Sequence, residues 1–394
     1  MSKRQEKKSI SILQITDSFL PHVGGKQLVV HHLASDLTLL DCSCSVLTNG
    51  SKDDNLNKNL PYTVFYYIKV FKILKFFFNL ASIVYHVIKE NINLIHAHRT
   101  FPAGYHAFLI GKLFNIPIII TAHGDDILTV PKINYGINLK KRLMKKSLYA
   151  LQNADAIIAL NEGMKSECIK LGTSPSKIYC IPIGININSL NDNRKLSSKK
   201  NRGKNLIVVG RNHPVKGYEN LIKAISIVVK NDSEIKCTII GKNTFKLFGL
   251  VEALCLQNNI TLVNQIDKSI EKGMPIKLQN LYKNSDIYIS SSLSESFSLT
   301  ILEAMAMGLP VIATDTVGSR GLIDDKINGF IIPVDNPEIM AEKILFLTND
   351  YSLQKRLGER ARSKAKMKQY SWNDIALKHL SVYEQLMLKN GMFF

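Results

Sequence analysis

The chain has 394 residues, which is too long for one ordinary hydrophobic core and favours two domains. Its hydrophobic content of 45% excludes an intrinsically disordered protein. The net charge of +19 indicates an acidic partner such as nucleotide phosphates, an anionic membrane surface or nucleic acid.

Cysteine usage and the apolar segments indicate the compartment. The six cysteines are scattered without C-x-x-C spacing, which is typical of a reduced, cytoplasmic protein. Residues Met1–Ser9 are basic, but the apolar run after them stops at Gln14, which is too short for a secretory signal. The longest apolar segment, Phe76–Ile88, falls short of the ~20 residues that span a bilayer. We therefore expect no transmembrane helix.

The first half of the chain alternates short apolar runs with helical stretches. The expected strands are Ile10–Ile15, Ser45–Thr48, Leu94–His96, Ile116–Ala122 and Ala156–Leu160. This alternation predicts a doubly wound parallel sheet, in which the carboxyl ends of the strands line the ligand crevice.

A pair of glycines, Gly24 and Gly25, precedes a helical pattern over Lys26–Leu40. Glycines at a helix start allow the backbone to approach a phosphate closely. A simple tight turn explains them equally well.

Histidines follow two of the expected strands. His96 and His98 have an i, i+2 spacing that would suit a metal, but no third ligand is evident, so structural roles are favoured. His123 is followed directly by glycine and two aspartates, which makes it a candidate site residue as well as an ordinary loop histidine.

Two basic clusters lie in the first half. Lys69, Lys72 and Lys75 are spaced by three within the aromatic segment Tyr62–Tyr85, so on a helix they would form one basic stripe beside apolar rings. The second cluster is Lys140, Lys141, Arg142, Lys145 and Lys146. Together they favour peripheral contact with an anionic membrane over the alternative of core aromatics with a solvated lysine face.

A polar, aperiodic segment at 187–204 is predicted to be a linker. A second alternating set of strands and helices follows it, with strands expected near Leu206–Gly210, Lys236–Gly241, Ile260–Val263, Asp286–Ser291, Val311–Thr314 and Gly329–Ile332. We expect one Rossmann-like domain over 1–186 and a second Rossmann-like domain over 205–372, facing a central cleft. An amphipathic segment from about 373 to 394 is expected to form a helix that packs back on the first domain.

The most informative stretch is Asn284–Asp315. It is predicted to contain a strand at Asp286–Ser291, a small-residue loop at Ser292–Ser298 and a helix at Leu299–Met307. The start of such a helix binds anions, but two carboxylates, Glu295 and Glu303, are also placed there. Carboxylates repel phosphate and suit hydroxyl groups beside it, which points to a nucleotide sugar.

Glu303 also has a purely structural explanation, because the run from Thr300 to Glu303 matches a capping box. The structural explanation of Glu295 is weaker, because it lies in a loop and has no obvious partner within the motif.

Two cations follow the first strand of the second half, Arg211 and Lys216, just before a helix. A helix terminus contributes up to ~2 kcal/mol to anion binding, whereas micromolar affinity requires about 8 kcal/mol. The remaining binding free energy for a diphosphate would come from Arg211 and Lys216. The planar guanidinium of Arg211 would bridge two phosphate oxygens, and the ammonium group of Lys216 would add a point charge.

The run from Ser294 to Thr314, with Glu295 and Glu303 eight positions apart, resembles the signature of glycosyltransferase family 4, retaining enzymes of GT-B fold. Weaker similarities extend over most of the chain, including Gly24-Gly25 and the run Thr121–Asp126. Family members often carry glycine where this chain has Ser296 and Ser298.

The resemblance implies a role for each candidate residue. Glu303 would bind the ribose hydroxyls, Glu295 the transferred sugar, and Arg211 and Lys216 the diphosphate, together with backbone amides at Leu299 and Thr300. Gly25 would approach the phosphates from the first domain and His123 would contact the sugar near the reacting carbon. The family usually lacks an essential metal, so none is expected as a cofactor.

The expected function is transfer of a sugar from a nucleoside-diphosphate sugar to an acceptor hydroxyl with retention, in synthesis of bacterial surface polysaccharide or a lipid-linked glycan. The expected location is the cytoplasm, with peripheral contact at the inner membrane and no nucleic-acid partner. The alternatives are a GT-B epimerase or phosphorylase, or a basic membrane-binding or nucleic-acid-binding protein without catalysis.

Overall fold

A computed structural model describes residues 10–21, 24–50, 57–68, 70–71, 74–187, 190, 203–264, 266 and 274–391. The chain divides into two compact units. Unit 1 contains residues 1–129, 136–184 and 372–394, and unit 2 contains residues 130–135 and 185–371. The linker expected at 187–204 lies mostly outside the described residues.

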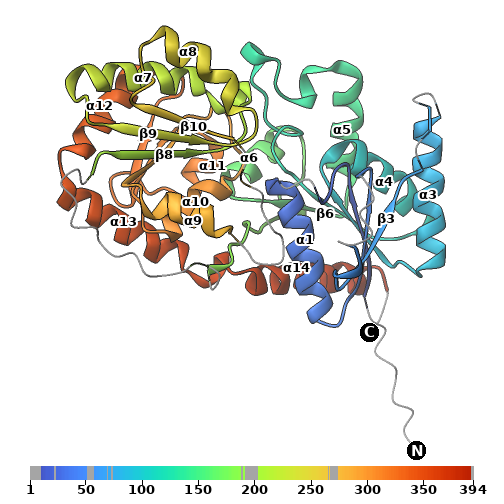
Figure 1. The fold of residues 1–394 in the computed structure, drawn as a ribbon. Coiled ribbons are helices and arrows are strands. Elements are labelled where there is room, and N and C mark those ends of the chain that lie inside the picture. Colours follow the sequence, from blue (N-terminus) through green and yellow to red (C-terminus); the bar gives the residue numbers. More distant parts are fainter. Residues whose placement is uncertain are drawn as a thin grey trace, which may run out of the picture. The chain divides into compact units, whose positions relative to one another are not determined.

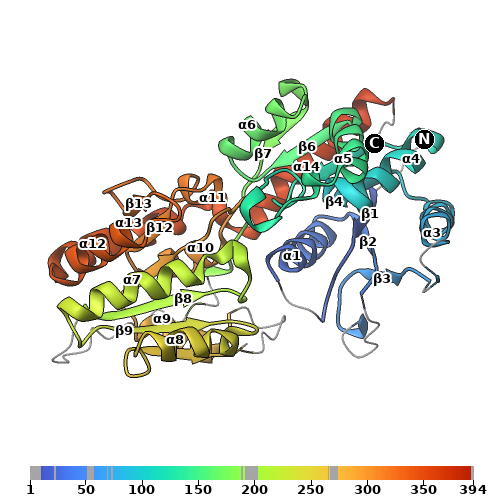
Figure 2. The same cartoon turned by 90° about the horizontal axis from the view of Figure 1, so that it is seen from above.

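Unit 1 contains a seven-stranded sheet in the order β3-β2-β1-β4-β5-β6-β7, and every pairing is parallel (Figures 1 and 2). Its strands are β1 (Ser11–Thr16), β2 (Ser43–Thr48), β3 (Thr63–Tyr66), β4 (Leu94–His98), β5 (Ile118–Thr121), β6 (Ala156–Ala159) and β7 (Ile178–Cys180). The central strands are buried along their whole length, as a parallel sheet with helices on both faces requires.

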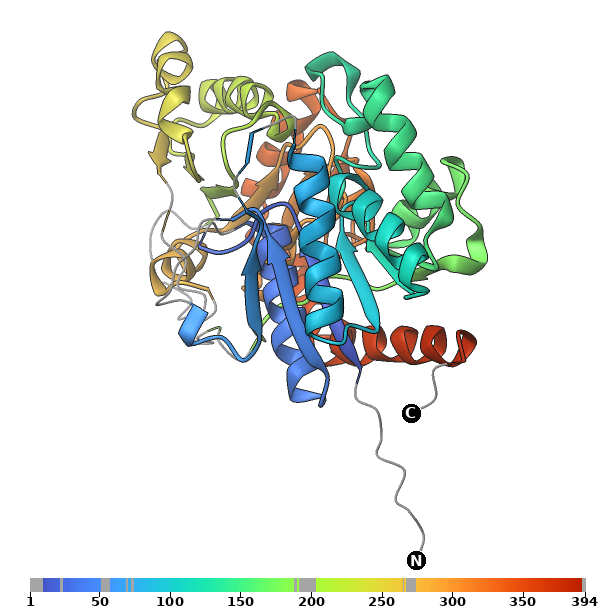
Figure 3. The same ribbon diagram turned by 90° about the vertical axis from the view of Figure 1, so that its right-hand side faces the viewer.

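Two groups of helices cover this sheet. The helices of unit 1 are α1 (Gly25–Leu39), α3 (Lys75–Lys89), α4 (Tyr105–Phe114), α5 (Lys141–Asn153), α6 (Glu162–Lys170) and α14 (Trp372–Lys389). The helix α14 packs against α1, and its Trp372 ring stacks on His32 at 4.6 Å between ring centroids. The helices α3, α4 and α5 pack side by side in that order, with α3 at the front of Figure 3.

Unit 2 contains a six-stranded parallel sheet in the order β10-β9-β8-β11-β12-β13. Its strands are β8 (Asn205–Val209), β9 (Lys236–Ile240), β10 (Ile260–Val263), β11 (Ile287–Ser290), β12 (Val311–Thr314) and β13 (Gly329–Ile332). Its helices are α7 (Tyr218–Asn231), α8 (Phe248–Ala253), α9 (Ile276–Lys283), α10 (Leu299–Ala306), α11 (Val317–Arg320), α12 (Pro337–Thr348) and α13 (Tyr351–Ala365). The helices α7 and α12 pack together on one face and α10 and α13 on the other (Figure 1).

The strand order of each sheet reverses direction once. In unit 1 the reversal falls between β1 and β4, and in unit 2 it falls between β8 and β11. Loops leave in opposite directions at such a point, and the crevice beyond the carboxyl ends of the two strands is where open α/β sheets bind ligands. Each unit therefore has one expected ligand position.

The prediction that one helix carries the whole basic stripe of the first half is wrong. The segment after Tyr62 forms strand β3, and Val70 and Phe71 are not helical, so α3 begins only at Lys75. Lys69 and Lys72 lie outside the described residues. The β-branched and aromatic composition of 63–66 suits a strand, and the helical spacing belongs only to the lysines from Lys69 onward.

No helix in the described part of the chain is long and apolar enough to cross a membrane.

Candidate functional site

In unit 2 the loops after β8 and β11 are joined by hydrogen bonds. The amide of Leu293 donates to the carbonyl of Val215 at 2.7 Å, and the hydroxyl of Ser291 donates to the carbonyl of Lys216 at 2.7 Å. Gly217 allows this close approach, because it has a φ of +61° and a Cβ there would overlap the carbonyl oxygen of Ser291. These contacts hold the backbone of Lys216 against the loop that carries Glu295.

Lys216 and Glu295 form an ion pair at the topological switch point. The Nζ atom of Lys216 lies 2.6 Å from Oε2 of Glu295, with 21% of the lysine side chain and 18% of the glutamate side chain exposed. The Glu295 backbone is held from the other side, because its carbonyl accepts from the amide of Gly318 at 2.7 Å. Both side chains are therefore positioned by backbone contacts while each retains some exposure to a ligand.

The helix α10 begins beside this pair. Ser298 is its N-cap, and the Ser298 hydroxyl accepts from the amide of Ile301 at 3.4 Å. Leu299 and Thr300 are the first two residues of the helix, so their amides have no carbonyl partner within it. The Thr300 side chain accepts from the Tyr288 hydroxyl at 2.7 Å. A small pocket beneath is lined by Lys216, Tyr218, Tyr288, Ser290, Ser291, Ser292 and Thr300.

Glu303 lies further along α10 and is buried, with 5% of its surface exposed. Its Oε2 atom accepts from the Tyr282 hydroxyl at 3.2 Å. Burial, followed by the nearby Glu303 carboxylate, raises the pKa of Tyr282, so this hydroxyl remains a donor. The capping-box explanation of Glu303 is wrong, because the N-cap is Ser298 and Glu303 lies beyond the first turn.

Arg211 directly follows Gly210, at the carboxyl end of β8, and is exposed. Unlike Lys216, it has no ion-pair partner among the residues that the structure describes. It is therefore an uncompensated cation at the same edge of the sheet.

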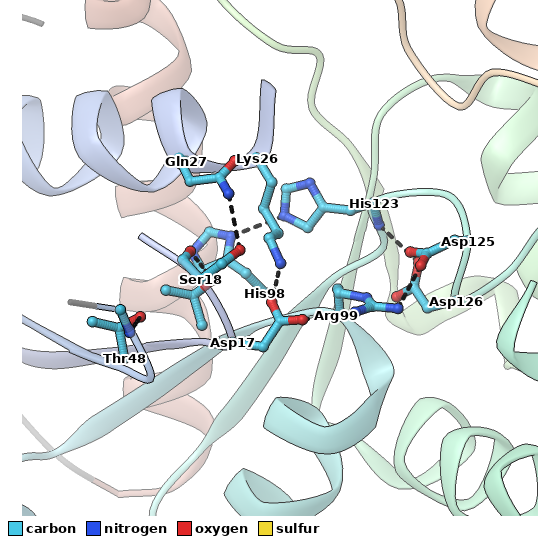
Figure 4. Close-up of polar contacts among 12 residues, drawn as sticks. Asp17, Ser18, Lys26, Gln27, Thr48, His98, Arg99, His123, Asp125 and Asp126 are labelled. Atoms are coloured by element: carbon cyan, nitrogen blue, oxygen red, sulfur yellow. Dashed lines mark hydrogen bonds and ion pairs between the residues drawn. The ribbon is translucent and has the colours of Figure 1, made fainter. Parts of the chain in front are cut away.

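In unit 1, four charged side chains meet at the switch point between β1 and β4 (Figure 4). Arg99 donates through Nη1 to Asp17 at 2.7 Å and through Nη2 to Asp125 at 2.6 Å. Lys26, in the first turn of α1, pairs with the same Asp17 carboxylate. Burial acts to raise the pKa of Asp17, but Lys26 and Arg99 outweigh it and hold the pKa below its ordinary value.

The backbone at Arg99 is strained. Its φ of 96° with ψ of 149° lies in a region that glycine normally occupies. Two carboxylates hold its guanidinium, and its carbonyl accepts from Gly104 at 3.0 Å. Strain of this kind persists only where the surroundings impose it, and it concentrates at functional sites.

Asp126 organises the loop that contains His123. It is completely buried, and its carboxylate accepts from the amides of Thr100 at 2.9 Å, His123 at 3.1 Å and Gly124 at 2.9 Å. Burial and the neighbouring Asp125 raise the pKa of Asp126 despite these bonds and the nearby Arg99. Asp126 is thus an internal support, whereas Asp125 is partly exposed.

His123 is half-buried and its ring contacts His98 (Figure 4). The Nε2 atom of His123 lies 3.0 Å from Nδ1 of His98, and Nε2 of His98 lies 2.9 Å from Oε1 of Gln14. Burial lowers the pKa of His123 well below its ordinary value, and the cations Lys26 and Arg99 act in the same direction. His123 is therefore neutral at pH 7.

His96 and His98 do not form a metal site. The ring nitrogens of His96 bond Tyr383 and Thr121, each at 2.7 Å, and those of His98 bond His123 and Gln14. Throughout the described residues, no group of three or more potential ligands is arranged to hold a metal ion.

Gly25 is the first residue of α1, after an N-cap, Gly24, that has no side chain to offer. A Cβ on Gly25 would meet no atom of the described residues within 4 Å, apart from its chain neighbours. The first amides of α1 therefore remain accessible to an anion.

Sequence reasoning did not single out Asp17, Lys26 or Arg99. The available signal was their position, because Asp17 closely follows the first expected strand and Arg99 comes shortly after the expected strand Leu94–His96. Only the adjacency of β1 and β4 in the sheet brings these residues together.

Comparison with known proteins identifies the class. A model described as Glycosyl transferases group 1 matches residues 191–364, and one described as Glycosyltransferase Family 4 matches residues 23–189. An uncharacterized glycosyltransferase of Methanocaldococcus jannaschii is 29% identical over 93% of this chain and 96% of its own.

Two further proteins extend the comparison. The Escherichia coli UDP-Gal:alpha-D-GlcNAc-diphosphoundecaprenol alpha-1,3-galactosyltransferase is 26% identical over 66% of this chain and 68% of its own. The crystal structure of Anabaena HepE in complex with UDP-glucose is similar at a TM-score of 0.77 and 18% identity, covering 95% of this chain and 100% of HepE.

The two doubly wound units and these similarities define a glycosyltransferase of GT-B fold. The alternative of a basic binding protein without catalysis is therefore wrong. The chain belongs to glycosyltransferase family 4.

Proposed function

We propose that this enzyme transfers a sugar from a nucleoside-diphosphate sugar to an acceptor hydroxyl with retention of anomeric configuration. The observation that carries the proposal is the Lys216 and Glu295 ion pair, at the switch point of unit 2 beside the start of α10. The pair places a cation that would bind phosphate beside a carboxylate that would bind sugar hydroxyls, and the proposed donor contains both groups.

The leaving diphosphate gains negative charge as the bond to the sugar breaks. Lys216, the exposed Arg211 and the amides of Leu299 and Thr300 are the groups that would stabilise it. Preorganised donors of this kind contribute about 3 to 4 kcal/mol each to transition-state stabilisation. They provide a route to catalysis that does not require a metal ion, which is also part of the proposal.

The two glutamates would serve different rings of the donor. Glu295 keeps some exposure beside the phosphate-binding lysine, which suits the transferred sugar. Glu303 is buried and oriented by Tyr282, which suits the fixed ribose. In unit 1, Gly25 would approach the phosphates and the neutral ring of His123 would contact the sugar near its reacting carbon.

The acceptor is proposed to be a lipid-linked glycan of the kind used for bacterial surface polysaccharide. The Escherichia coli relative, whose name gives a diphosphoundecaprenol acceptor, supports this choice. Contact with an anionic membrane at the cytoplasmic face would bring the enzyme to such an acceptor.

The outer helices of unit 1 support the membrane contact. Phe77, Tyr85 and Ile88 on α3 are 67%, 56% and 61% exposed, and Leu74, the N-cap residue, is 48% exposed, while the opposite side of the helix is buried. Lys146 of α5 lies 5.4 Å from the Phe76 ring centre, and the whole basic cluster 140–146 is exposed at its charged positions. Apolar side chains flanked by cations suit the interface of an anionic bilayer.

The test is a screen of nucleotide sugars by saturation-transfer NMR, followed by turnover with the best donor and candidate acceptors. Release of nucleoside diphosphate that depends on the acceptor, with an axial product linkage from an axial donor, is expected. An isomerised sugar nucleotide without net release of nucleoside diphosphate would favour an epimerase, and sugar transfer that requires inorganic phosphate would favour a phosphorylase. An inverted linkage would disprove retention.

A further inference from the structure

We infer that Gln14 and His98 are positioning residues that fix the tautomer and ring orientation of His123. The inference rests on the proposed function in one respect, because that function assigns the contact with the sugar to His123. The arrangement itself is contained within unit 1, in the polar centre of its sheet.

The arrangement begins at Gln14 on β1. Gln14 is completely buried, and its Oε1 atom lies 2.9 Å from Nε2 of His98, which is also completely buried on the neighbouring strand β4. A carbonyl oxygen accepts hydrogen bonds and cannot donate them. With Oε1 of Gln14 facing this atom, Nε2 of His98 carries the hydrogen, and the buried Nε2 of Gln14 is left without a hydrogen-bond partner among the described residues.

The role of the other ring nitrogen of His98, Nδ1, follows because the ring is neutral. Burial lowers the pKa of His98 well below its ordinary value, with His123, His379 and Lys26 acting in the same direction. A neutral imidazole has one N–H, so Nδ1 of His98 is an acceptor. The partner at 3.0 Å is Nε2 of His123, which must then be the donor.

His123 is therefore held as the Nε2–H tautomer, with an acceptor lone pair at Nδ1. Its backbone is fixed separately, because the Asp126 carboxylate accepts from the amides of His123 and Gly124. The strand ladder fixes the backbone of Gln14 opposite that of His96, and His98 belongs to the same strand as His96. Ring and backbone are thus determined by separate buried groups.

This arrangement gives His123 a defined chemical role. A neutral ring whose Nε2–H is directed at His98 can accept a hydrogen bond from a sugar hydroxyl at Nδ1, but it cannot supply a proton there. His98 and Gln14 would act on transfer only through His123, which makes them positioning residues and not catalytic ones.

The direct test is ¹⁵N NMR of the full chain labelled at histidine, at pH 7, with His98 and His123 assigned by single substitutions. Both rings are expected to be neutral and protonated at Nε2. Protonation of either ring at Nδ1, or an imidazolium form of either, would overturn the inference. This result does not depend on activity, so it stands apart from success or failure of the proposed reaction.

A second test uses Gln14→Leu, which removes the acceptor oxygen at similar volume. We expect the His98 and His123 spectra to show mixed tautomers and kcat to fall about 10-fold to 100-fold, as for other residues that orient a site ligand. The dissociation constant for nucleoside diphosphate should stay within about twofold, because unit 2 carries the proposed phosphate groups. Unchanged tautomers in a folded variant would contradict the inference.

The matched control is Thr121→Val, which removes the partner of His96 on the adjoining strand at similar burial. This substitution should leave the tautomers of His98 and His123 as they are. If it alters them as much as Gln14→Leu does, the effect is general loosening of the sheet and the specific role is refuted.

Discussion

At the residue scale, Lys216 is the clearest phosphate candidate, because its ammonium group is held at the switch point by Glu295 and by the loop contacts of its backbone. We expect Lys216→Ala to weaken nucleoside diphosphate binding about 10-fold to 100-fold, the loss of one charged hydrogen bond. Binding of the free nucleoside should change little. Calorimetry with both ligands measures the difference, and equal losses would mean that Lys216 does not contact phosphate.

The two glutamates allow a matched comparison at this scale. Glu295→Gln should lower kcat by about 100-fold while leaving nucleotide affinity the same or tighter, because it frees Lys216 from its counterion. The same change at Glu303 should instead weaken the nucleotide, through the ribose. Turnover and nucleotide affinity are measured for both variants. Unaltered turnover in Glu295→Gln would remove that residue from the mechanism.

At the scale of elements, the turn between β8 and α7 depends on glycine. Gly217→Ala places a Cβ at positive φ against the Ser291 carbonyl, so we expect a loss of roughly 1 to 3 kcal/mol in the free energy of unfolding. Gly249→Ala on α8 is the control, since a Cβ there meets no atom of the described residues within 4 Å and should be neutral or slightly stabilising. Urea unfolding compares the two. Equal stability would show that the turn relaxes without cost.

The helix α3 can be tested as a membrane-contacting element. The variant Phe77→Ser with Ile88→Ser removes two exposed apolar side chains, each worth about 1.5 to 3 kcal/mol if buried in the bilayer. Binding to anionic vesicles, measured by co-sedimentation, should fall at least about tenfold. Phe245→Ser, at a position 58% exposed in unit 2, should leave binding intact. Equal loss in both variants would contradict a specific role for α3.

At the scale of the whole molecule, buried histidines are concentrated in unit 1, so acid is expected to destabilise unit 1 more than unit 2. Eight described histidines lie in unit 1 and one, His213, lies in unit 2. Burial lowers the pKa of His31, His106 and His379 to about 4. Unfolded histidines bind a proton near pH ~6.5. Between these values the unfolded chain binds more protons, so stability falls as the pH falls.

We expect these three histidines to lower the free energy of unfolding of unit 1 by roughly 3 kcal/mol between pH 6 and pH 5. Trp372, the single tryptophan, lies in unit 1 and reports its unfolding in urea by fluorescence. His106→Gln removes one of the eight described histidines of unit 1 whose pKa is lowered, and it should reduce the change in free energy over this range by roughly 1 kcal/mol. A urea midpoint that is constant over this range would refute the expectation.

Local patterns were sufficient for most elements of the fold. The expected helix Leu299–Met307 corresponds to α10, and the expected strands of the second half correspond to β8 to β13 within a residue or two. Strands β3 and β7 were missed. The first lay within a segment whose lysine spacing imitates a helix, and the second, at the edge of the sheet, is only three residues long. Periodicity is informative only when a run is long enough to show it.

The sequence by itself determined the alternating α/β architecture, the family resemblance, and the pairing of a carboxylate loop with a helix start at Glu295 and Leu299. These follow from neighbouring residues, whose hydrophobic period and turn chemistry are local properties. Only the tertiary structure decided that Asp17 meets Arg99, that Gln14 orients His98, and that Ser298 rather than Thr300 caps α10. Strand order and loop packing bring together residues that are distant along the chain, and no local pattern contains that information.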